Sequence, residues 1–181
     1  MADGGPSRKS AASSSGLKLE VDVVRHPEAW ASAPVTDAML KRAARAALLA
    51  AAPDRQGLHQ VTLLLTDDNE MKELNRAWRG KDAPTNVLSF PAGEEAREPG
   101  VLGDVVLAHE TILKEAREAN IALTNHVSHL IVHGVLHLLG FDHMNDAEAE
   151  RMENLERTAL ASLGIADPYA EERAGPVEVA P

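Results

Sequence analysis

The sequence predicts a single compact domain of the α+β class, and three observations support this prediction. Short apolar runs typical of β-strands occur beside longer segments of helix-forming residues, without the regular strand–helix alternation of a parallel α/β fold. The length of 181 residues corresponds to about one domain, at roughly 150 residues per domain. The composition, 44% hydrophobic and 25% charged, is that of a globular chain with enough apolar side chains for a core.

Four segments have the pattern of β-strands. Residues 17–24 alternate apolar and polar side chains, as a half-buried strand requires. Residues 60–66 form a nearly continuous apolar run, which is typical of a buried strand. Two shorter apolar runs, residues 87–90 and 102–107, complete a predicted set of about four strands.

Five segments favour helices. The first of them stops at Pro53, which cannot continue a helix. Asp67 with Glu70, and Asn145 with Glu148, have the spacing of an N-terminal capping pair. The predicted helices span residues 36–52, 67–76, 109–120, 124–139 and 145–163.

We expect the domain to span residues 17–166. Residues 1–16 are rich in Gly and Ser and predict a disordered N-terminal tail, and residues 167–181 predict a flexible C-terminal tail. The first segment lacks the roughly 7–15 apolar residues of a secretory signal, and no apolar stretch reaches the ~20 residues of a membrane span. The sequence therefore predicts a cytoplasmic protein without a membrane partner.

Composition and charge exclude several classes of function. The net charge of −10 argues against a surface that wraps nucleic acid or anionic lipid over its whole extent, so a polyanion has to meet a local basic patch. One Tyr, two Trp and two Phe are too few for the base-stacking platforms of the common RNA-binding folds. The absence of Cys excludes disulfides, thiolate zinc fingers and cysteine nucleophiles.

Histidines are concentrated in one predicted helix and in the turn that follows it. Five of the eight histidines lie within residues 126–143, and three of these belong to the string HGVLHLLGFDH that begins at His133. On a helix, His133 and His137 are one turn apart, with Cβ atoms about 5–6 Å from each other. Both imidazoles can therefore bind the same ion.

A glycine explains how a third histidine can join this pair. On a continuous helix, His143 would face away from the other two. Gly140 can adopt the left-handed conformation that ends a helix, so we expect the chain to turn there and bring His143 back to the metal. Three imidazoles without a thiolate suit zinc or another late divalent metal, and an open site of this kind carries a water with a lowered pKa.

The two remaining histidines of the segment are not expected to be ligands. On a regular helix His129 lies about 12 Å from His137 along the axis, too far to share its ion. We interpret His126 and His129 as helix-face residues or as partners of the ligands. The alternative for the whole cluster is that it only caps and decorates a surface helix.

The spacing of the string also matches a zinc-peptidase motif, in which Glu directly follows the first His and acts as general base. Here Gly134 has that position. Without the carboxylate, no side chain is evident that would deprotonate the attacking water and protonate the leaving amine. A metallopeptidase is therefore only a distant alternative.

A local basic segment interrupts the acidic chain. Residues 72–81 contain four basic side chains and one acidic side chain. If the strand predicted at 87–90 borders the histidine helix, Arg79 can reach a phosphate and hold two of its oxygens with the planar guanidinium. The alternative is a solvated helix end. The acidic residues of segment 145–173 are interpreted as a mainly solvated helix face, and the alternative is a docking surface for a basic partner.

The sequence resembles the YbeY family of bacterial metal-dependent endoribonucleases in four segments. These are the string HGVLHLLGFDH, the segment PTNVLSFP at residues 84–91, the Leu-Gly-Asp at 102–104 and the acidic segment AEAERMENLE at 147–156. The resemblance covers about residues 17–165. It implies a small α+β domain with a mixed sheet and the metal helix beside it.

The resemblance also implies a function and a site. It implies one zinc ion per chain held by His133, His137 and His143, with catalytic roles for His133, His137 and an RNA-contacting Arg79. The implied activity is single-strand-specific cleavage in ribosomal RNA maturation, at the 3′ end of 16S rRNA, and in ribosome quality control. The implied partners are ribosomal RNA precursors, the small ribosomal subunit and assembly factors such as the Era GTPase. The alternative is a ribosome-assembly factor with a mainly structural metal.

Overall fold

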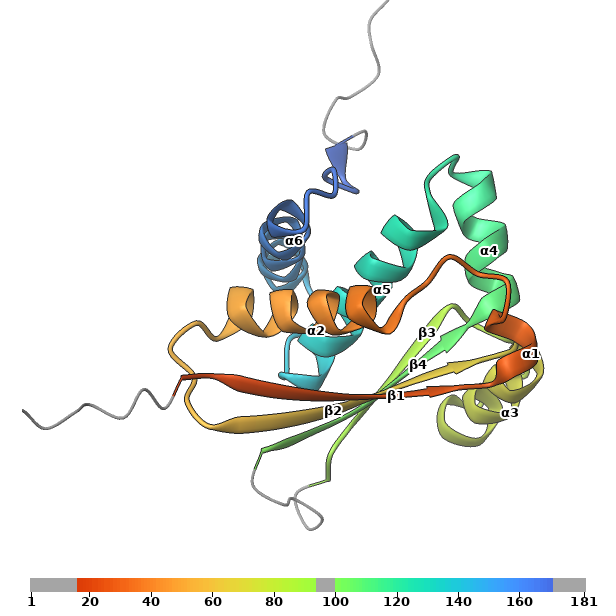
Figure 1. Cartoon of the computed structure of the whole chain (residues 1–181), viewed down its shortest axis with the longest axis horizontal. Helices are drawn as coiled ribbons and strands as arrows, with labels where there is room; N and C mark the ends of the chain where they lie inside the picture. The colour runs from red at the N-terminus through yellow and green to blue at the C-terminus, as the bar shows by residue number, and fades with distance from the viewer. Residues whose placement is uncertain (1–15, 94–99, 171–181) are drawn as a thin grey trace, which may run out of the picture.

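The structure is a computed structural model that describes residues 16–93 and 100–170. These residues form four strands and six helices (Figure 1). Along the chain the elements are β1 (Lys18–Arg25), α1 (Pro27–Trp30), α2 (Asp37–Ala51), β2 (Leu58–Thr66), α3 (Asp68–Arg79), β3 (Val87–Pro91), β4 (Val101–Ala108), α4 (His109–Glu118), α5 (Leu123–Leu138) and α6 (Asp146–Ser162).

The four strands form one mixed sheet in the order β1-β2-β4-β3. β1 and β4 both run parallel to β2, whereas β3 runs antiparallel to β4, with Ser89 opposite Val105. β3 is therefore an edge strand. One side of β3 pairs with β4, and its other side is free to border a binding site.

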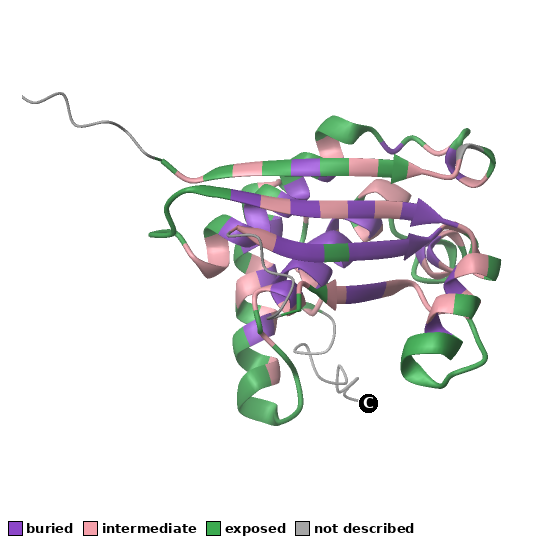
Figure 2. Ribbon diagram, turned by 90° about the horizontal axis from the view of Figure 1, so that it is seen from below, coloured by how far each residue is buried: buried purple, intermediate pink, exposed green. Residues whose placement is uncertain are grey.

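Helices α2 and α5 pack over one face of the sheet, α6 packs on these two helices, and α3 lies near one end of the sheet (Figure 1). Successive side chains of a strand point to opposite faces. Accordingly, Val105 and Leu107 of β4 belong to the main core under the three helices, whereas Val106 and Ala108 pack in a smaller cluster with Met71 of α3. The central strands β2 and β4 are the most buried, as Figure 2 shows in a view from below.

This architecture confirms the predicted α+β class, the mixed sheet and the four strands. The helix α1 was not predicted, because four residues are too few to show a helical period. Trp30 in this helix is buried, and its indole N–H donates to the backbone oxygen of Thr66 at 2.9 Å. The helix α3 continues three residues beyond the prediction, since it ends only at Gly80, which has a left-handed φ of 69°.

Both predicted capping pairs are confirmed. The side chain of Asp67 accepts a hydrogen bond from the N–H of Glu70 at 2.9 Å, and that of Asn145 accepts one from the N–H of Glu148 at 3.0 Å. The domain boundaries stay a prediction, since residues 1–15 and 171–181 lie outside the described part of the chain. None of the helices within 16–93 and 100–170 combines the length and the apolar character that a membrane span needs.

Candidate metal centre

The turn at the C-terminal end of α5 determines where the last histidine of the cluster lies. The helix ends at Leu138, and Gly140 has a φ of 92°. The N–H of Gly140 donates to the carbonyl of His137 at 3.0 Å, and the N–H of Phe141 donates to the carbonyl of Leu136 at 3.1 Å. These two bonds form a Schellman motif. The turn predicted at Gly140 is therefore confirmed.

The turn brings His143 beside His133 and His137. One ring nitrogen of each residue lies within 4.8 Å of the other two. The Nε2 atoms of His133 and His137 are 3.0 Å apart, close to the ~3.3 Å that separates two ligands bound to one tetrahedral zinc at 2.0–2.1 Å. His143 is exposed, so the cluster opens to solvent on its side. The three side chains form a group that could hold a metal ion.

A buried carboxylate orients the first of these histidines. Glu156 of α6 is only 1% exposed, and its Oε1 accepts a hydrogen bond from Nδ1 of His133 at 2.7 Å. A proton on Nδ1 leaves Nε2 with a free lone pair directed at the cluster. Oε2 of Glu156 accepts from Nε2 of His129 at 3.0 Å and from the hydroxyl of Tyr169. A carboxylate behind a histidine is the usual support of a metal ligand in proteins.

The pKa shifts in this cluster favour a neutral His137 and an ionised Glu156. Burial alone would raise the pKa of Glu156, but hydrogen bonds from His129, His133 and Tyr169 outweigh it and lower the pKa to about 2. Burial lowers the pKa of His137, and its two neighbouring histidines lower it further. A neutral imidazole is the form that binds a metal. Burial and the bond to Glu156 raise the pKa of Tyr169, so its hydroxyl keeps its proton.

His126 is held by a different carboxylate. Its Nε2 lies 2.7 Å from Oε2 of Glu115 on α4. The same carboxylate accepts two hydrogen bonds from the side-chain amide of Asn86, at 3.0 and 3.2 Å. The side-chain oxygen of Asn86 accepts from the N–H of Val87 at 2.7 Å, at the start of β3. His126 and His129 thus both bind carboxylates, and neither belongs to the three-histidine group.

Gly134 lies where α5 comes closest to the sheet. A Cβ atom at this position would lie 2.7 Å from Cγ1 of Val105 and 3.1 Å from Oγ of Ser89. Because Val105 is fully buried in the core, it has little room to move. The glutamate that a zinc peptidase has at this position does not fit, and a side chain here would point at the sheet instead of the histidines.

The histidine cluster forms one side of an open groove of about 780 Å³. The lining comes from α3 and the loop after it, from β3, and from the end of α5 with its turn. The hydroxyl of Ser89 donates to the carbonyl of Gly134 at 3.1 Å, so β3 borders the histidine helix. Arg79, whose Nη2 is 3.5 Å from the carbonyl oxygen of Ser89, lines the same groove as the three histidines.

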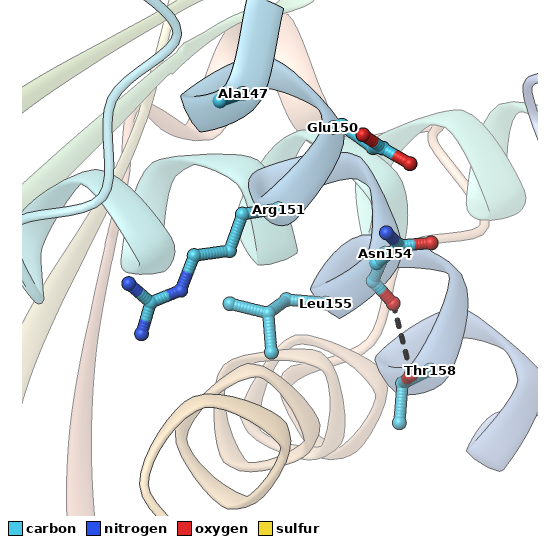
Figure 3. Close-up of a pocket in the computed structure, with 6 residues that line it drawn as sticks. All are labelled: Ala147, Glu150, Arg151, Asn154, Leu155 and Thr158. Carbon is cyan, nitrogen blue, oxygen red and sulfur yellow. Dashed lines mark hydrogen bonds between the residues drawn. The ribbon is translucent and has the colours of Figure 1, made fainter.

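A second hollow, of about 360 Å³, lies along α6 and shares no lining residue with the groove (Figure 3). The hydroxyl of Thr158 donates to the backbone oxygen of Asn154 at 2.8 Å. The guanidinium of Arg151 lies 5.1 Å from the ring centroid of Phe141. Among the residues that line this hollow, Glu150 is the one carboxylate, so the lining offers no metal site.

Fold and site together define a class of protein: a single α+β domain with a candidate three-histidine metal centre in a groove that also holds an arginine. The family model described as Endoribonuclease YbeY matches residues 29–164 of this chain. The chain belongs to the YbeY endoribonuclease family. This confirms the resemblance seen in its motifs and the expected enzyme class.

Individual relatives agree with this assignment. The chain is 48% identical to the endoribonuclease YbeY of Parvibaculum lavamentivorans, over 96% of this chain and 98% of that protein. It is 51% identical to the endoribonuclease YbeY of Paramagnetospirillum magneticum, over 86% of this chain and 99% of that protein. The solution structure of TM1509 from Thermotoga maritima has the same fold, with a TM-score of 0.53 and 22% identity over 82% of this chain and 98% of that one.

Two residues of the site could not be identified from the sequence. The expectation of a solvated helix face is wrong for Glu156, which is buried by the packing of α6 against α5 and has three hydrogen-bond donors around its carboxylate. Tyr169 comes from the segment assigned to the C-terminal tail. No local pattern distinguishes Glu156 from the other acidic residues of α6, and its role depends on contacts across more than twenty residues of chain.

Proposed function

We propose that this protein is a zinc-dependent endoribonuclease that cleaves single-stranded RNA. The observation that supports this most strongly is the groove that Arg79 shares with the three histidines. A guanidinium beside a metal centre is suited to holding and activating a phosphodiester. Relatives that match nearly the whole chain are endoribonucleases, which supports RNA as the substrate.

Zinc fits the donor set of the cluster. His133, His137 and His143 offer three imidazole nitrogens without a thiolate, and Glu156 stands behind the first of them. We propose one zinc ion per chain, held by these three histidines. Bound zinc would supply Lewis acidity and lower the pKa of a water molecule to about 7. Three ligands leave a coordination position for solvent or substrate, as a catalytic site requires.

The residues of the groove have separate roles in this proposal. His133 and His137 act as catalytic residues through the ion that they hold. Arg79 holds two oxygens of the scissile phosphate and stabilises the negative charge that grows on it in the transition state. The groove has the volume of a small-molecule site, about 300–1,000 Å³. Such a volume favours a few unpaired nucleotides over a duplex.

For the cellular role, we propose the maturation of ribosomal RNA precursors in the cytoplasm, including the 3′ end of 16S rRNA, and ribosome quality control. The partners in this role are the small ribosomal subunit and assembly factors such as the Era GTPase. The family resemblance, not the groove, is what supports these assignments. The chain as a whole carries a net charge of −10, which repels RNA. We therefore expect the RNA to bind only locally, at the groove that contains Arg79.

A cleavage assay with two substrates tests the proposal. The purified protein is incubated with a single-stranded precursor containing the 3′ end of 16S rRNA and, separately, with casein, each with and without a chelator. We expect metal-dependent RNA cleavage that returns with added zinc, and intact casein. RNA cleavage that survives complete metal removal would overturn the proposal. Metal-dependent folding without RNA cleavage would instead support an assembly factor with a structural metal.

A further inference from the structure

Trp78 is unusually exposed for its size. Its side chain is 68% exposed, whereas tryptophan is on average a well-buried residue. The position on α3 explains the exposure. Met71 and Leu74 on the same helix pack into the small cluster against the sheet, and Trp78 continues their stripe one turn further. Trp78 is the last residue but one of α3, and apart from the ring of Phe90 on β3 most of the indole surface is open to solvent.

Trp78 directly precedes Arg79, which lines the groove, while Trp78 itself is not one of the lining residues. Its ring packs edge-to-face on Phe90 of β3, with ring centroids 5.7 Å apart. Phe90 belongs to the small cluster that also contains Leu88, and Leu88 lines the groove, as does Arg79. A large aromatic surface is therefore exposed beside the proposed phosphate-binding arginine.

The charges around the indole are suited to a polyanion. Lys72 and Arg76, earlier on α3, are paired with the carboxylates of Asp82 and Glu73. In the described part of the chain, Arg79 and Lys81 lie within ion-pair distance of no carboxylate, and both line the groove. The cations nearest to the groove are thus the ones left free for phosphates.

We propose that Trp78 stacks on one unpaired base of the bound RNA, while Arg79 and Lys81 hold the phosphates on either side of it. This inference rests on the proposed function, since it assigns a base subsite to the same groove. Every base has a π face, so the contact supplies affinity and positions the strand without selecting a sequence. A single stacking residue is also compatible with the low aromatic content of the chain, because that content argues only against extended base-stacking platforms.

The two tryptophans allow a direct observation of the contact. Trp30 is 3% exposed and its indole is bonded to Thr66, so RNA cannot reach it. Single-stranded RNA is mixed rapidly with the protein, and the tryptophan fluorescence is recorded before cleavage occurs. Any fluorescence that the RNA quenches should therefore come from Trp78. We expect the quench to persist in Trp30→Phe and to be absent in Trp78→Leu.

The affinity test uses a dye-labelled single-stranded RNA and fluorescence anisotropy, with zinc content and Tm confirmed equal in all variants. Trp78→Leu keeps apolar contact with Phe90 but has no π face, and we expect binding to weaken about 5- to 150-fold. Trp78→Tyr should recover most of the affinity. Ile121→Ala is the matched control, because it removes an apolar side chain that is 45% exposed and does not line the groove.

A series of oligonucleotides with one abasic position identifies the base. At the stacked position, loss of the base should weaken wild type but leave Trp78→Leu unchanged. Wild-type affinity in Trp78→Leu, no recovery in Trp78→Tyr, or equal losses along the whole abasic series would each overturn the stacking proposal while leaving the nuclease proposal intact. A wild-type protein that neither binds nor cleaves RNA would overturn both.

Discussion

The carboxylate of Glu156 on α6 accepts a hydrogen bond from Nδ1 of His133 on α5 at 2.7 Å. This bond leaves Nε2 of His133 available to a metal, and it makes the geometry of the candidate metal centre depend on how α6 packs against α5. The carboxylate is 1% exposed, so water cannot replace its partners. Its charge is maintained by the three donors that keep its pKa near 2.

Replacing Glu156 should therefore weaken metal binding without removing a ligand. We expect Glu156→Gln to lower zinc affinity about 10- to 100-fold, because the amide holds the His133 tautomer less strongly than the carboxylate does. Competition with a chromophoric chelator measures this affinity. Glu153→Gln is the control on the same helix, since Glu153 binds Arg157 and no histidine. Equal affinities in Glu156→Gln and wild type would contradict the assigned role.

The ligand assignment makes two histidines of α5 behave differently. His137→Ala removes one of three ligands and should lose most of the metal, whereas His129→Ala should retain it, because His129 contacts Glu156 and not the cluster. Elemental analysis of both purified variants gives the zinc content per chain. Equal loss in the two variants would refute the ligand set.

Gly134 should tolerate no side chain. In an exposed helix, Gly→Ala stabilises by about 0.8–1 kcal/mol, but a Cβ here would lie 2.7 Å from Cγ1 of Val105, and overpacking a core costs about 1–3 kcal/mol. We expect Gly134→Ala to lower the free energy of unfolding by up to about 2 kcal/mol, measured by urea denaturation.

A double variant shows whether the contact with Val105 is the cause. In a Val105→Ala background the space opens, and Gly134→Ala should become neutral or stabilising. If Gly134→Ala destabilised the protein equally in both backgrounds, close packing against the sheet would not be the reason for the glycine.

Arg79 and the metal centre should be separable. Arg79→Lys keeps the charge but loses the planar fork, so we expect normal zinc content and a loss of about 2–4 kcal/mol of transition-state stabilisation. The loss should affect kcat more than KM, because the guanidinium meets charge that develops during the reaction. A wild-type cleavage rate in Arg79→Lys at saturating RNA would show that Arg79 is only a solvated residue at the end of a helix and has no part in catalysis.

Much of the fold could be predicted because its signals are local. Each strand coincides with an alternating or continuous apolar run and each long helix with a segment of helix-forming residues, and Gly140 ends α5 with a turn that only nearby residues determine. The three histidines share one short string, so helix geometry and one glycine are enough to bring them together. The sequence predicts that Arg79 lies near the three histidines only if β3 borders α5. The structure meets this condition, because the hydroxyl of Ser89 on β3 donates to the carbonyl of Gly134 on α5.

The rest of the site depends on contacts that the sequence does not display. Glu156 is one acidic residue among several on α6, and only the packing of α6 against α5 buries it behind His133. Tyr169 joins the same carboxylate from a segment without a regular pattern. The space around Gly134 is likewise set by Val105, on a strand almost thirty residues earlier in the chain. The sequence therefore shows that the peptidase glutamate is missing, but it does not show that a side chain would clash there.

The stoichiometric restoration of activity by zinc tests the central proposal most directly. Protein freed of metal by a chelator and then dialysed is titrated with zinc, and cleavage of a single-stranded ribosomal RNA precursor is followed at each point. We expect the rate to rise linearly and to level off at one zinc per chain, and His143→Ala to recover little activity at that ratio. Full cleavage by the metal-free protein, or an equal recovery in His143→Ala, would contradict a nuclease centre built on His133, His137 and His143.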